Sequence, residues 1–129
     1  WGKEIQTFSV TKVGDSVTIY NAPAEPRIVS VASTSTLSIS SSATDQSIIT
    51  AQAEALTIAA PTGTPVEGQK VIVRIKDDGS ARAITFNAIF RAIGVTLPTT
   101  TVASKITYLG LVYNSTDTKW DIVATKTEA

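Results

Sequence analysis

Apolar and polar residues alternate with a period of two along much of the chain, which is the spacing of β-strands and not of helices. Residues 70–76 (KVIVRIK) place three β-branched residues on one face, and residues 16–20 (SVTIY) and 36–40 (TLSIS) alternate over shorter stretches. Helix signals are poor, because threonine and β-branched residues dominate. The pattern predicts an all-β fold, either an antiparallel β-sandwich or a barrel-like module.

Two hairpins are expected in the second half of the chain. Residues 77–80 (DDGS) give the strongest turn signal, since Asp-Gly tolerates the positive φ of tight hairpin turns, and residues 81–86 (ARAITF) supply the returning strand. Residues 114–118 (NSTDT) form a polar turn between residues 101–113 and residues 119–125 (KWDIVAT). From Ile106 to residue 113, the chain is largely nonpolar on both faces, and this predicts a central strand.

The first third of the chain is expected to be an extended N-terminal arm. Residues 33–47 are strongly biased to serine and threonine, which is typical either of a flexible linker or of a strand with a hydroxyl-lined solvent face. We interpret this stretch as a short strand followed by a loop at residues 40–46. The loop marks the expected boundary between an arm or attachment segment, residues 1–46, and a β-sandwich module, residues 47–129.

The composition favours burial of surface between subunits. The chain has 129 residues, which fits one domain or one domain with a short arm. Only 6% of the residues are aromatic, so we expect a thin core that is completed by assembly. The chain has no methionine, so Trp1 is not an encoded start, and we expect either a removed initiator or a piece of a longer chain.

The residue types that are missing exclude several function classes. Histidine and cysteine are both absent, which removes imidazole bases, thiolate and imidazole metal ligands and most hydrolase triads. The formal net charge is +0, whereas nucleic-acid binders normally carry a basic excess, and no apolar run has the length of a membrane span. We therefore predict no catalytic residue, no cofactor and no metal, and neither a nucleic acid nor a membrane as partner.

Two groups of carboxylates have both a chemical and a structural interpretation. Asp77 and Asp78 are adjacent and could bind a hard cation, but calcium loops alternate their ligands and the tight turn explains both residues. Asp117 and Asp121 flank Trp120, an arrangement that hints at sugar binding or glycoside hydrolysis. No acid–base pair in a cleft follows from this spacing, so Trp120 is more plausible as a core anchor of the last hairpin.

Further candidate interaction residues are aromatic or basic. A sugar-stacking platform would have to combine Trp120 with Tyr113 and Tyr108, yet alternation puts the two tyrosines on opposite faces of one strand. Arg74 and Arg82 lie on the expected hairpin of residues 70–91, where a basic face could meet an anionic glycan or a neighbouring subunit. The simpler interpretation is that these are solvated strand charges that prevent edge aggregation.

Three stretches, in the same order, carry a resemblance to a known family. They are LTIAAPTGTPVEGQKVIVRIKDDGSARAITF, RAIGVTLPTTTVASKITYLGLVYN and KWDIVAT before an acidic end. From about residue 48 to residue 129 the chain resembles a C-terminal module of tailed-bacteriophage virion surface proteins. The resemblance implies a component of a tail fibre, spike or other appendage that is usually homotrimeric, and it brings no catalytic residues. Trp1 and Phe8 would then be anchors of a virion-attachment arm.

The function expected from these observations is that of a structural virion protein, located on the surface of the phage particle. As an oligomeric fibre or spike, it would serve virion assembly, with other capsid or tail proteins as partners and a host surface glycan as a further candidate. One alternative is a head-decoration or cementing protein, which the small size favours and in which the arm would pair with the capsid as an added strand. Another is a small carbohydrate-binding module.

Overall fold

The computed structural model describes residues 25–129 in full and the backbone of residues 5–9 and 18–22. Within these ranges it contains strands and no helix, so the prediction of an all-β fold is confirmed. The strands are β1 (Ile5–Ser9), β2 (Thr18–Ala22), β3 (Ile28–Val31), β4 (Thr36–Leu37), β5 (Gln46–Gln52), β6 (Leu56–Ile58), β7 (Lys70–Asp77), β8 (Ile84–Phe86), β9 (Phe90–Ala92), β10 (Ile106–Asn114) and β11 (Lys119–Thr127).

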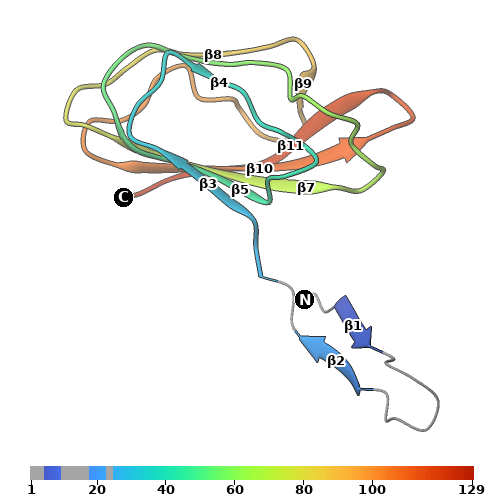
Figure 1. Ribbon diagram of the computed structural model, residues 1–129. Coiled ribbons are helices and arrows are strands. Elements are labelled where there is room, and N and C mark those ends of the chain that lie inside the picture. The colour runs from blue at the N-terminus through green and yellow to red at the C-terminus, as the bar shows by residue number, and fades with distance from the viewer. Residues whose placement is uncertain (1–4, 10–17, 23–24) are drawn as a thin grey trace, which may run out of the picture.

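Two sheets pack face to face and form a sandwich (Figure 1). One sheet has six strands in the order β3-β5-β7-β10-β11-β9, and the other has three in the order β4-β6-β8. Strands β1 and β2 pair with each other, antiparallel, in a separate two-stranded sheet. From β3 to β8 the chain therefore passes back and forth between the two sheets, and each turn of the chain adds one strand to each of them.

The strand pairing is mixed, whereas the sequence predicted antiparallel pairing. Successive turns stack in parallel: β3 pairs with β5 and β5 with β7 in one sheet, and β4 pairs with β6 and β6 with β8 in the other. Antiparallel pairing begins where β10 joins β7, and it continues in the hairpin of β10 and β11. That second hairpin, with its polar turn, is the one that the sequence predicted correctly.

The prediction of a hairpin with its turn at residues 77–80 is wrong. Gly79 does have a positive φ of 131°, but the turn leads from β7 in the six-stranded sheet to β8 in the three-stranded sheet. The places beside β7 are taken by β5 and β10, which are longer than β8. Ile84 of β8 instead faces the shared interior from the opposite sheet.

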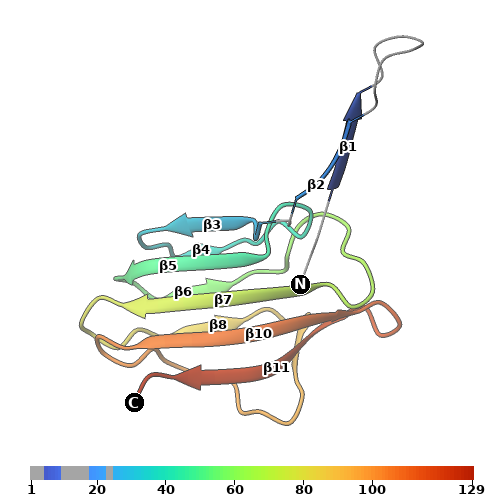
Figure 2. The ribbon, with the colours of Figure 1, turned by 90° about the horizontal axis from the view of Figure 1, so that it is seen from below.

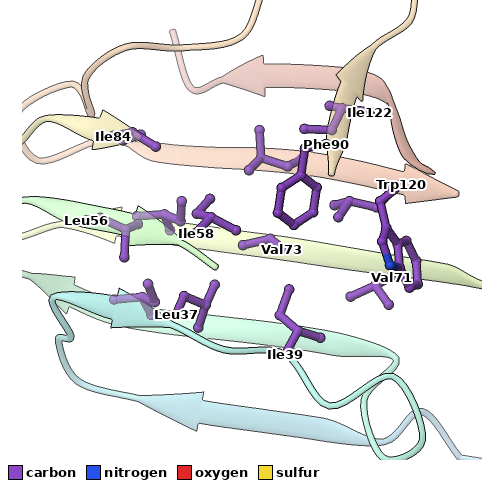
Figure 3. Packing of buried hydrophobic residues seen from close by; sticks show 14 of the residues in the cluster. Leu37, Ile39, Leu56, Ile58, Val71, Val73, Ile84, Phe90, Trp120 and Ile122 are labelled. Atoms are coloured by element: carbon purple, nitrogen blue, oxygen red, sulfur yellow. The ribbon is translucent and has the colours of Figure 1, made fainter. Parts of the chain in front are cut away.

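The core lies between the two sheets, where apolar residues from both point toward one another (Figure 3). The alternation of residues 70–76 is confirmed, because its apolar face is fully buried while Ile72 on the other face is exposed. Trp120 is 1% exposed and packs against Tyr113 with ring centroids 5.1 Å apart, so its role as a core anchor is confirmed. The core residues are Leu37, Ile39, Ile49, Leu56, Ile58, Val71, Val73, Ile75, Ile84, Phe90, Leu109, Leu111, Tyr113, Trp120 and Ile122.

The expected boundary between residues 46 and 47 falls inside the sandwich. Leu37 and Ile39 belong to the core, and β3 is hydrogen-bonded to β5, so residues 28–46 are the first turn of the same fold. The serine- and threonine-rich stretch is accommodated because its hydroxyls find local partners. Ser41, for example, is buried and donates its hydroxyl to the Thr62 carbonyl at 2.8 Å. Hydroxyl content alone therefore does not distinguish a linker from a strand.

The contact between the loops at residues 41 and 63 generates a prediction about stability. Gly63 has a φ of 83°, and a Cβ there would lie 2.8 Å from the Ser41 hydroxyl; Gly68 has a φ of 77° but open space around its Cβ position. We expect Gly68→Ala to cost about 1–2 kcal/mol from the left-handed backbone alone. Gly63→Ala should cost about 1 kcal/mol more, because it also disturbs the buried hydrogen bond of Ser41.

Urea unfolding monitored by tryptophan fluorescence measures both changes. In a Ser41→Ala background, the additional cost of Gly63→Ala should disappear, since the clash is removed. Equal effects of the two glycine substitutions in the natural background would contradict this account.

Candidate interaction surface

The two ends of the sandwich are finished differently. At one end, the three-residue strand β9 forms the edge of the six-stranded sheet beside β11, while residues 99–101 run beside β8. There the Ile84 N–H donates to the Thr99 carbonyl at 2.8 Å and the Thr101 N–H donates to the Arg82 carbonyl at 2.7 Å. At the other end lies the first turn, β3 and β4, and in the described residues no strand covers it (Figure 2). This end is the candidate interaction surface, and we call it the open end.

At the edge of β4, the backbone groups of Thr36 are hydrogen-bonded by the side chain of Thr34. The Thr34 hydroxyl donates to the Thr36 carbonyl at 2.8 Å and accepts the Thr36 N–H at 3.2 Å. Carbonyls on either side, those of Ser35 and Leu37, face β6 and accept from Thr57 and Ala59. The backbone groups of Thr36 that point away from β6 are therefore already occupied, and this edge offers little to an added strand.

At the edge of β3, by contrast, no side chain of the described residues forms hydrogen bonds with the outward backbone groups. The Arg27 carbonyl accepts from the N–H groups of Asp45 and Gln46, at 2.7 and 3.1 Å, so it faces β5. Because backbone groups alternate in direction along a strand, the N–H and C=O groups of Ile28 and Ser30 point away from β5. Since β3 is the edge strand, no strand of the described part of the chain pairs with them. They form a free edge.

Arg27 holds the beginning of β3 in place. Its guanidinium makes two hydrogen bonds to the Asp45 carboxylate, at 2.8 and 3.1 Å, and donates a third to the Ser42 carbonyl at 2.6 Å. The same guanidinium, as hydrogen-bond donor, lowers the pKa of Asp45 below its usual value. A forked guanidinium fixes direction as well as distance, so the position and orientation of β3 are set before any partner binds.

A pocket lies between the edges of β3 and β4, with a volume of about 200 Å³. Its apolar wall is formed by Val29 and Val31 of β3 and by Leu37 and Ile39, which are core residues. The hydroxyl residues Thr34, Thr36, Ser38, Thr44 and Ser47 complete the lining. Val29 and Val31 remain 46% and 37% exposed, and Ile28 on the outer face is 54% exposed. The pocket thus reaches the outermost core residues, and its exposed apolar surface comes from β3.

The described residues do not form the aromatic platform that a sugar-binding module would need, in agreement with the alternation of the sequence. Trp120 and Tyr113 are buried together in the core, so neither presents a ring to a partner of the folded chain. Tyr108 is 41% exposed and lies on the opposite face of β10, as the alternation predicted. Trp1 lies outside the described residues, and only the backbone of Phe8, in β1, is described. The two proposed arm anchors therefore stay predictions.

The expected basic face is divided, because residues 70–91 are not a hairpin. Arg74 lies on the outer face of the six-stranded sheet, beside Tyr108 in register. Arg82 precedes β8 and pairs with Asp78 at 3.3 Å. Arg91 is bound to Asp117 and Asp121, at 3.0 and 2.8 Å. Arg74 and Arg91 both lie on the outer face of the six-stranded sheet, where Arg91 is bound by the two carboxylates, whereas Arg82 lies outside this sheet.

Asp77 is a structural group and not a cation ligand. Its carboxylate is buried and accepts hydrogen bonds from the Thr101 hydroxyl and from the N–H groups of Ser104 and Gly79. Burial alone would raise the pKa of Asp77, but these three hydrogen bonds outweigh it, so the pKa is lowered. In the described residues, no group of three or more acidic side chains lies close enough to hold a metal. Sequence analysis assigned this residue to a turn but missed its long-range partners.

Comparison with protein-family models, with curated proteins and with solved structures gives no match. Within the described residues, no helix has the length and hydropathy needed to cross a membrane.

The burial of Asp77 predicts a specific dependence of stability on pH. Since its folded pKa lies below the ordinary value of 3.8, the ionised carboxylate stabilises the fold above that pH. This contribution is lost as the pH falls through the lower, folded pKa. We expect Asp77→Asn to reduce the free energy of unfolding by about 1–3 kcal/mol at pH 7, because at least one buried donor loses its acceptor.

Chemical denaturation of wild type and variant between pH 7 and pH 2 provides the measurement. The difference between the two proteins should shrink as the pH falls below about 4. Asp78→Asn is the matched control: Asp78 forms a partly exposed pair with Arg82, so its loss should change stability by less than about 1 kcal/mol. A wild-type-minus-variant difference that stays constant down to pH 2 would argue against this role of Asp77.

Proposed function

We propose that this chain is a structural subunit of a tailed-phage virion, without enzymatic activity, that assembles with itself into a surface appendage such as a fibre or spike. The observation that carries the proposal is the open end of the sandwich. A free strand edge stands beside an apolar pocket that leads into the core, and a protein that functions alone would expose both to water. A homotrimer, as the sequence resemblance implies, would cover this end in each subunit.

The exposed side chains of β3 give the expected gain from assembly. All four residues of this strand are exposed, and three of them are Ile28, Val29 and Val31. Burying a valine or isoleucine fully is worth about 1.5–3 kcal/mol, so covering these half-exposed residues contributes roughly 1 kcal/mol each. Exposed, unpaired edges that carry apolar side chains are uncommon in proteins that remain monomeric. This supports a role in which association is part of the function.

The location on a phage particle rests on the resemblance of the second half of the sequence. The stretches that carry it include β6, β7 and the β10–β11 hairpin, which build most of the core. The resemblance therefore concerns the strands that build the core. A structural role requires only this folded core and the open end. The head-decoration alternative uses the same open end but a different partner, namely the capsid lattice.

Light scattering and immunogold labelling together test the proposed function. We expect a solution mass of three times the 13.6 kDa chain, unchanged over a wide range of concentrations. Gold-labelled antibodies against the chain should bind tail structures of the phage particles produced by the strain that encodes it. Label over the heads would support the decoration alternative instead. A monomer that labels no particle would contradict the proposal.

A further inference from the structure

We propose that the free edge of β3 accepts a β-strand from the N-terminal hairpin of a second copy of this chain. The inference rests on the proposed function, because it assumes that the chain assembles with itself. It adds which strand is the acceptor, which segment is the donor and how the subunits are connected. In this arrangement, the N-terminal hairpin of one subunit extends the six-stranded sheet of the next.

The acceptor is defined by the backbone of Ile28 and Ser30. Their outward N–H and C=O groups form a short row of donors and acceptors, and strand addition to such an edge is a common mode of protein recognition. The neighbouring edge of β4 cannot compete, since the Thr34 hydroxyl occupies the corresponding groups of Thr36. The clamp between Arg27 and Asp45 holds the acceptor in position. Binding therefore requires little reorganisation of the acceptor.

The donor is the two-stranded sheet of β1 and β2. An isolated two-stranded hairpin is only marginally stable in water, and a third strand or another sheet is normally needed to support it. Each of its strands has five residues, against four in β3, so the lengths match. Docking would satisfy both partners at once, because the hairpin gains a third strand and the open end gains a cover.

The connection between β2 and β3 favours a second copy over the same copy. It contains Pro23 and Pro26, and each proline fixes its own φ and pushes the preceding residue toward an extended conformation. From the sequence, we expect an extended link, which disfavours the tight reversal that β2 of the same chain would need in order to lie beside β3. Such a geometry favours exchange between subunits. Identical head-to-tail contacts close into a ring when the rotation between subunits is right, and a trimer is such a ring.

Cysteine trapping in the full-length chain tests this arrangement directly, with no background because the chain contains no cysteine. One chain carries Ser30→Cys, and a second chain with a different tag carries Gln6→Cys in β1 or Asn21→Cys in β2, which are paired positions of the hairpin. After mixing and mild oxidation, we expect disulfides between the unlike chains for one of the two arm positions. Cross-links only between two Ser30→Cys chains would overturn the inference, because they would mean that β3 edges pair with each other.

An internal disulfide and a complete absence of cross-links are two further outcomes of this experiment. A chain that carries both Ser30→Cys and an arm cysteine, and that forms only an internal disulfide, would show that each subunit covers its own edge. This too would overturn the inference. If the wild-type chain is a trimer but the cysteine variants form none of these cross-links, the inference is contradicted and the proposed function stands. A wild-type monomer at every concentration would contradict both.

A proline at the acceptor provides a second, independent test. Ser30→Pro removes an N–H that points away from β5, so the pairing of β3 with β5 remains possible while strand addition is blocked. Ser30→Ala is the matched control, because it keeps the N–H. We expect light scattering to show a shift to monomer for Ser30→Pro and an unchanged trimer for Ser30→Ala. A Ser30→Pro protein with the wild-type circular dichroism spectrum and an intact trimer would overturn the inference.

Discussion

The structure depends on the parallel stacking of successive turns of the chain. Each turn contributes one strand to each sheet, and most of its backbone hydrogen bonds go to neighbouring turns. A stack of this kind leaves an unpaired edge at each end, as repeat proteins do. The last turn is covered by segments that return alongside, with β10 beside β7 and residues 99–101 beside β8. The first turn has no such neighbour in the described part of the chain, and this difference creates the candidate interaction surface.

The elements that follow from local pattern were predicted correctly. The buried face of residues 70–76, the hairpin of β10 and β11 and the burial of Trp120 all come from alternation over fewer than ten residues. The arrangement of these elements was not predictable in the same way. The Asp-Gly turn signals where the chain changes direction, but it does not specify which sheet the next strand joins. Parallel pairing links residues about 18 to 30 positions apart and leaves no local signature in one sequence.

The site depended even more on contacts that are distant in the sequence. The position of β3 is fixed by the link between Arg27 and Asp45, which are 18 residues apart, whereas the edge of β4 is closed by a local contact between Thr34 and Thr36. The serine- and threonine-rich composition of that stretch suggested a linker, whereas one of its threonines closes an edge and one of its serines, Ser41, is buried in the fold. The alternation of Leu37 and Ile39 did predict a short strand there, which the structure confirms as β4 with both residues in the core.

Protection of backbone amides from hydrogen exchange tests the central claim most directly. The account predicts that, in the assembled protein, the amides of Ile28 and Ser30 exchange slowly, because a strand from another subunit accepts hydrogen bonds from them. In the Ser30→Pro monomer, the Ile28 amide should exchange fast, while Val73 in the middle of the sheet stays protected in both. A stable assembly in which Ile28 and Ser30 exchange as fast as exposed loops would contradict it.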